Sequence, residues 1–155
     1  MLNTSRALTL IIALLPGIGY ACSCRYWRLP EEEQIRLAFE QSSLVVFVRV
    51  AALEIKEGGP PVRNTISGQA EILKTFKSPV DHLRQIEIKI VNPEISSSCG
   101  EGASPELGDY ILLYLQTPTI TEEDFIFCSR SRIVKNRAEA SSELAELGRL
   151  AGHES

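Results

Sequence analysis

Hydrophobic and polar positions alternate most regularly in residues 84–93, where Ile86, Ile88 and Ile90 fall on one side and Glu87 and Lys89 on the other. Strict alternation with a period of two is typical of a strand that buries one face. This segment is therefore predicted to be a strand with its isoleucines in the core.

Four further segments have the composition of strands. Residues 43–55 are rich in β-branched side chains, alternate from Phe47 through Val50 and are predicted to form a strand with a buried centre. The composition of residues 109–118 predicts a strand buried on both faces. Residues 65–78 place Ile66, Gly68, Ala70 and Ile72 on one face, with Lys74 or Lys77 in water. Residues 124–134 are predicted to form the last strand.

Two amphipathic helices are expected to flank the strands. Residues 28–43 begin with Pro30 and acidic side chains, both favoured in a first helical turn, and their apolar face holds Ile35, Ala38 and Phe39. In residues 136–152 the helical spacing recurs at Ala138, Leu144, Leu147 and Leu150.

Together these elements predict a mainly β fold. Loops at residues 56–64 and 94–108 are rich in glycine, proline or serine, which marks breaks between strands. Five strands with one helix before and one after favour a five-stranded OB-fold barrel, because closure removes exposed strand edges. An open sandwich is the alternative architecture.

Residues 1–21 are predicted to be a secretory signal peptide. Arg6 precedes an apolar run over residues 7–15, Pro16 and Gly17 break that run, and the small residue Ala21 follows. The run is too short for a membrane span, which needs about 20 apolar residues. We expect cleavage after Ala21, one domain over residues 22–155, and a secreted or periplasmic protein; a lipoprotein signal is the alternative.

The net charge of the chain argues against a nucleic-acid partner. The formal net charge is −4, whereas nucleic-acid binding uses clustered Lys and Arg. The acidic runs at residues 31–33 and 122–124 are expected on solvated faces. We expect a monomer with no nucleic-acid partner, no membrane span and no cofactor of its own.

Four cysteines, Cys22, Cys24, Cys99 and Cys128, all fall in the exported part. An oxidising compartment favours two disulfides. Of the three possible pairings, Cys22–Cys24 is disfavoured because so small a ring strains the bond. A four-cysteine zinc site and a redox dithiol at Cys22 and Cys24 are the alternatives.

The order of these features resembles the N-terminal, netrin-like domain of the tissue inhibitors of metalloproteinases (TIMPs). The matching segments are the mature start "CSC", the helix-to-strand segment "AFEQSSLVVFVRV", the strand end "KTFKS", the loop "SSSCG" and the late "FIFCSRS". They follow the family order over nearly the whole mature chain.

The resemblance implies disulfides Cys22–Cys99 and Cys24–Cys128. It also implies that the free amino group and carbonyl of Cys22 chelate the catalytic zinc of a target metalloprotease, with Ser23 pointing into the specificity pocket of that protease. Cys24 and Arg25 continue this inhibitory ridge, and its second half lies beside it, comprising Ser96, Ser97, Ser98, Cys99 and Gly100.

The sequence leaves two other function classes as alternatives, a protein-binding module and an enzyme. A netrin-like protein-binding module without protease inhibition would use the loop at residues 56–64 or the aromatic side chains of Tyr26 and Trp27. The sequence contains no HExxH motif, no phosphate-binding glycine loop and no Ser-His-Asp arrangement with local support. We therefore expect an inhibitor and not an enzyme.

Overall fold

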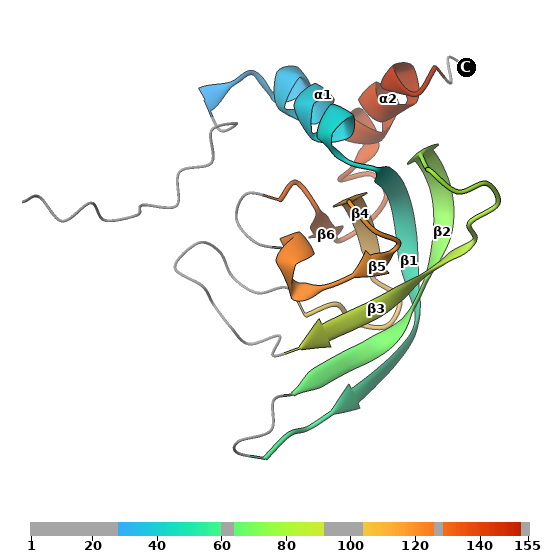
Figure 1. Cartoon of the computed structure of the whole chain (residues 1–155). Coiled ribbons are helices and arrows are strands. Elements are labelled where there is room, and N and C mark those ends of the chain that lie inside the picture. Colours follow the sequence, from blue (N-terminus) through green and yellow to red (C-terminus); the bar gives the residue numbers. More distant parts are fainter. Residues whose placement is uncertain (1–27, 60–63, 92–103, 126–128, 153–155) are drawn as a thin grey trace, which may run out of the picture.

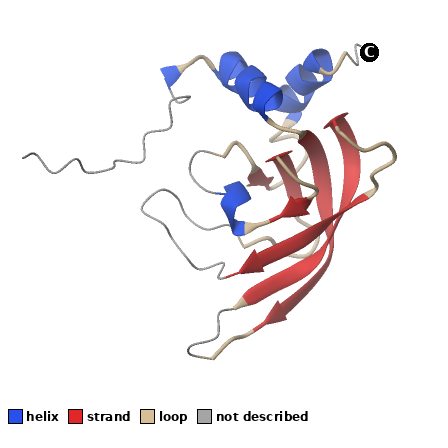
Figure 2. Cartoon of the chain, viewed as in Figure 1, coloured by secondary structure: helices blue, strands red, loops and turns tan. Residues whose placement is uncertain are grey.

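The computed structural model describes residues 28–59, 64–91, 104–125 and 129–152. Along the chain, the elements are α1 (Glu31–Gln41), β1 (Leu44–Lys56), β2 (Thr65–Lys77), β3 (Gln85–Val91), β4 (Tyr110–Leu115), β5 (Thr119–Ile120), the 3-10 helix η2 (Glu122–Phe125), β6 (Arg132–Val134) and α2 (Ser141–Leu150). Figure 1 shows a strongly curled sheet with the two helices at one end, and Figure 2 separates helices from strands by colour.

The strands form one six-stranded sheet with the order β5-β3-β2-β1-β4-β6. β1 lies at its centre and pairs antiparallel with both β2 and β4. Of the six described strands, β5 alone runs parallel to its neighbour, and it pairs with β3 at Glu87 and Ile88. The right-handed twist of so long a sheet bends it into a half-barrel (Figure 1).

Each face of the central strands has its own core. The concave face buries a first cluster that includes Val46, Val48, Ile88, Ile111 and Leu113. The opposite face buries a second cluster, which contains side chains of both helices together with Val45, Phe47, Leu112 and Tyr114. Because both faces are covered, β1 and β4 are apolar at consecutive positions and not only at alternate ones.

The mainly β architecture with two helices is confirmed, as are the inward isoleucines of β3 and the double-sided burial of β4. The expected number of strands was wrong, because the described residues form six, and the two short strands, β5 and β6, lie at the edges of the sheet. Residues 124–134 do not form one strand: Phe125 belongs to η2, and β6 begins at Arg132. The C-terminal helix begins at Ser141 and not near residue 136, so Ala138 is exposed while Ala140 is buried.

Gly68 on β2 is required by the close approach of β1. The β1–β2 register shifts between Val50 and Ala52, and a Cβ on Gly68 would meet the backbone oxygen of Ala52 at 2.1 Å and Cδ2 of Leu53 at 2.9 Å. A backbone atom cannot move aside as a flexible side chain can. Local β1 structure therefore depends on a residue without a side chain.

We expect Gly68→Ala to lower the free energy of unfolding by about 1–3 kcal/mol, the usual cost of overpacking. Urea denaturation measures the change. Gly59→Ala is the matched control, because a Cβ there meets nothing within 4 Å. Equal stability of the two variants would show that β1 relaxes freely at its bulge.

Within the described ranges, none of the helices is both long and apolar enough to cross a membrane.

Candidate functional site

The residues selected from the sequence lie outside the described ranges. These are Cys22, Ser23, Cys24 and Arg25 at the expected mature start, Ser96, Ser97, Ser98, Cys99 and Gly100 in the long loop, and Cys128. The neighbouring residues on both sides of the loop segments are described, and they show which parts of the chain are brought together.

The flanks of the Cys99 and Cys128 segments lie side by side. Val91 is the last described residue before the loop that holds Cys99, and its N–H donates to Oε2 of Glu122 at 3.1 Å. Glu122 opens η2, which ends at Phe125, immediately before the segment with Cys128. The parallel pairing of β5 with β3 holds η2 against the end of β3.

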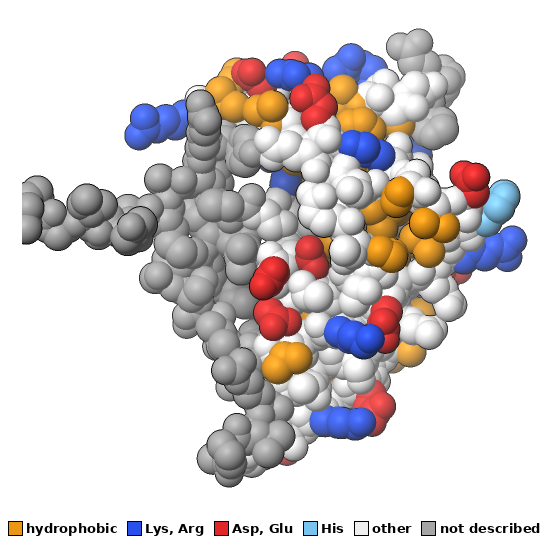
Figure 3. Space-filling model, viewed as in Figure 1, with side chains coloured by type: hydrophobic (Ala, Val, Ile, Leu, Met, Phe, Trp, Pro, Cys, Tyr) orange, Lys and Arg blue, Asp and Glu red, His pale blue; other side chains and the backbone are white. Residues whose placement is uncertain are grey.

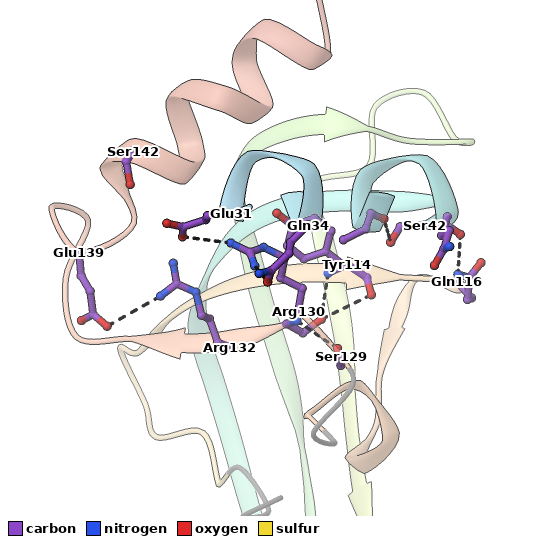
Figure 4. Close-up of a pocket in the computed structure, with 13 residues that line it drawn as sticks. Glu31, Gln34, Ser42, Tyr114, Gln116, Ser129, Arg130, Arg132, Glu139 and Ser142 are labelled. Carbon is purple, nitrogen blue, oxygen red and sulfur yellow. Dashed lines mark hydrogen bonds and ion pairs between the residues drawn. The ribbon is translucent and has the colours of Figure 1, made fainter. Parts of the chain in front are cut away.

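Arg130 ties the chain after Cys128 to the first turn of α1. Its guanidinium donates from Nη1 to Oε1 of Gln34 at 3.2 Å and from Nη2 to Oε1 of Glu31 at 3.3 Å. Figure 4 shows both side chains converging on Arg130 from the helix above it. α1 begins three residues after Arg28, the first described residue, and is the first described α-helix after Cys22 and Cys24.

A carboxylate buried below α1 organises this contact. Glu143 on α2 is 1 % exposed, and its Oε1 accepts from Nε of Arg130 and from Oη of Tyr114, both at 2.6 Å. Its Oε2 accepts from Nη2 of Arg132 at 2.7 Å. One carboxylate thus joins β4, β6 and α2, and Arg130 extends the network to α1.

The charges in this network fix its protonation. Burial and the adjacent Glu143 charge raise the pKa of Tyr114 far above its ordinary value, so the phenol stays neutral and donates its proton to the carboxylate. For Arg130, burial of the guanidinium works to lower the pKa, but the attraction of Glu143 outweighs it and the pKa is raised. Arg130 therefore remains a cation wherever the protein is folded.

A cavity of about 520 Å³ lies beside the network, between α1, the β4–β6 edge and the start of α2. Its lining is mostly polar and includes Gln34, Gln41, Gln116, Ser129, Ser142 and Glu139 (Figure 4). Both arginines in its wall already face carboxylates, Arg130 at Glu31 and Arg132 at Glu139. The cavity therefore offers hydrogen bonds but no unneutralised cation for an anionic ligand.

Two contacts thus bring flanks of the cysteine segments together: Glu122 binds Val91, and Arg130 binds the first turn of α1. The buried network around Glu143 that holds Arg130 was not predicted from the sequence. A signal for it exists in the sequence of α2. Glu143 stands four positions before Leu147 and directly before Leu144, so it falls on the inward face of an amphipathic helix. An acidic residue on such a face requires a buried partner. Among the residues with described positions, no three His, Cys, Asp or Glu side chains group as metal ligands would.

No protein-family model and no curated protein matches the chain.

Proposed function

We propose that the chain is a TIMP-like inhibitor of zinc metalloproteases, exported and cleaved so that Cys22 is its first residue. The observation that carries the proposal is the contact of Arg130 with Glu31 and Gln34. It holds the chain two residues after Cys128 against the helix that begins seven residues after Cys24. Seven residues span at most about 25 Å, so a Cys24–Cys128 disulfide is within reach.

The second disulfide, Cys22–Cys99, is supported by the contacts at the end of β3. The chain that leads to Cys99 leaves β3 at Val91, where Glu122 binds its N–H. Glu122 is the first residue of η2, and the chain continues toward Cys128 from the last residue of that helix, Phe125. Two disulfides from one N-terminus to these neighbouring segments would fix Cys22 in a single place.

The chemistry of the inhibitory contact follows from the position of Cys22. A free α-amino nitrogen and the carbonyl oxygen of the same residue form a five-membered chelate, which replaces the water at the open coordination position of a catalytic zinc. An α-amino group has a pKa of about 8, so a neutral fraction exists at physiological pH and zinc displaces the remaining proton. The disulfides lower the ordering cost of binding by holding both donor atoms in advance.

The remaining ridge residues give the contact its specificity. Ser23 enters the main specificity pocket of the protease, Cys24 and Arg25 follow along its cleft, and Ser96, Ser97, Ser98, Cys99 and Gly100 form the second half of the ridge. We propose a netrin-like OB fold for the curled, six-stranded sheet. The pairing of β1 with both β2 and β4, and the parallel strand β5 on the outer edge of β3, support this part of the proposal.

The test is inhibition of a panel of zinc metalloproteases by the oxidised chain that starts at Cys22. We expect stoichiometric, reversible inhibition of at least one member, and loss of inhibition after reduction of the disulfides. Binding to a protein partner without inhibition of any protease would support the netrin-like binding module instead.

A further inference from the structure

Among the described residues, the outer half of β1 pairs with a strand on one side alone. Pairing with β4 ends at Arg49, and the last backbone bonds on that side join Val50 to Asp109 and Gly108. Among the described strands, β2 is then the only partner of β1 as far as Lys56. This part of β1 runs to the lower end of the sheet in Figure 1.

The register shows which backbone groups face the edge. The N–H of Ile72 donates to the carbonyl of Arg84, so Ile72 is turned away from β1. Hydrogen-bonded and non-hydrogen-bonded pairs alternate along an antiparallel ladder. Counting along β2 from Ile72, Gly68 and Ile66 are also turned away from β1, and their partners Leu53 and Ile55 direct N–H and C=O to the free edge.

The side chains at this edge are divided between its two faces. Ile55 lies opposite Ile66, which is buried in the concave core, yet Ile55 itself is 64 % exposed. On the other face, Lys56 Nζ lies 3.6 Å from Glu54 Oε1. The edge therefore combines an uncovered apolar side chain with one charge of each sign.

We propose that this edge pairs with the same edge of a second copy of the chain, antiparallel and centred on Ile55. In that register Glu54 lies opposite Lys56 of the second copy, and Lys56 lies opposite its Glu54. The two Ile55 side chains meet on the concave face, and the backbone N–H of each Ile55 donates to the backbone carbonyl of the other. Centring the pair on Glu54 instead would oppose two glutamates, so the charges favour the Ile55 register over that one.

The surface charge around the edge does not repel a second copy of the chain. Acidic and basic side chains are interspersed over the lower part of the sheet in Figure 3, so no single-sign field repels an identical surface. Charged side chains, lysine above all, commonly protect an edge strand from pairing, but in the Ile55 register Glu54 and Lys56 each lie opposite a charge of the other sign. The dimer does not involve Cys22, so its test is independent of the test for protease inhibition.

Sedimentation velocity of the mature chain over a concentration series tests the dimer. We expect reversible association with a dissociation constant on the order of 100 μM, because two edge strands bury less than a standard interface. Lys56→Glu and Glu54→Lys should each weaken association about tenfold, since each puts like charges opposite one another twice in the dimer. The double variant E54K/K56E should restore it to within about threefold.

The matched control is Lys89→Glu on β3. Lys89 and Glu87 are also two residues apart on one strand and exposed, and Nζ of Lys89 lies 2.9 Å from Oε1 of Glu87. It should leave association unchanged, and circular dichroism of every variant establishes that the fold is intact. A chain that stays monomeric at all concentrations would overturn the proposal and restore the monomer expected from the sequence. The proposal would also be overturned if neither single charge reversal changed the dissociation constant of the dimer, or if the double variant did not restore it.

Discussion

A single alanine placed before Cys22 is expected to weaken inhibition of a sensitive zinc metalloprotease at least a hundredfold. The added residue turns the α-amino group into a peptide N–H, which has no lone pair to give to zinc. One of the two chelating atoms is lost, and a metal–ligand contact of this kind contributes several kcal/mol. A loss of about 3 kcal/mol already corresponds to about a hundredfold in the inhibition constant.

The control for this prediction is the same alanine added after Ser155, at the other end of the chain. That variant should inhibit as the parent does, and thermal unfolding should be the same for all three proteins. Equal inhibition by the chain with alanine before Cys22 would show that the α-amino group of Cys22 does not bind the zinc. Partner binding that survives the extension would then favour the netrin-like binding module.

Replacing Glu143 by glutamine is expected to lower the free energy of unfolding by about 3 kcal/mol. Removing one member of a buried ion pair leaves the other charges without compensation, which typically costs about 3–5 kcal/mol. The lower end applies here because the Arg132 side chain is 38 % exposed and water can solvate it. Urea denaturation at neutral pH measures the loss.

Glu40→Gln is the matched control for this variant. Glu40 pairs with Arg36 at 2.9 Å on α1, but both side chains are largely solvated, so the pair contributes at most about 0.5 kcal/mol. A stability loss for Glu143→Gln as small as that of Glu40→Gln would show that the buried network does not hold the helices to the sheet.

The fold was predictable where one physical signal decides the structure. Ile86, Ile88 and Ile90 alternate with charged residues because β3 has water on one face, and the period of two follows from that. β4 lacks alternation because the helices cover its second face, and its consecutive apolar residues indicated that both faces are buried. In both cases the pattern along the chain records which faces are buried.

The short edge elements were not predictable in this way. Thr119 and Ile120 are a strand only because they pair with Glu87 and Ile88, distant residues that a local pattern cannot reveal. Phe125 is buried as its apolar character indicates, but hydrophobicity does not distinguish a 3-10 helix from a strand over four residues. The start of α2 was misplaced because Ala138 fits a helical spacing although it precedes the helix.

The candidate site also has residues that the sequence predicted and residues that it did not. The cysteines and the ridge were selected from their spacing and family resemblance, and those positions lie outside the described residues. The network of Glu143, Arg130 and Tyr114 depends on contacts between α2, β4 and the segment before β6. No local motif joins these three residues, and only their arrangement in the fold brings them to one point.

The decisive measurement is the visible absorption spectrum of a target metalloprotease whose catalytic zinc has been replaced by cobalt. The spectrum reports the ligands and geometry of the metal directly. Adding the chain that starts at Cys22 should shift the cobalt bands as an amine and a carbonyl replace water, while the chain with an extra alanine should leave them unchanged. Inhibition by the Cys22 chain without any change in the bands would contradict zinc chelation.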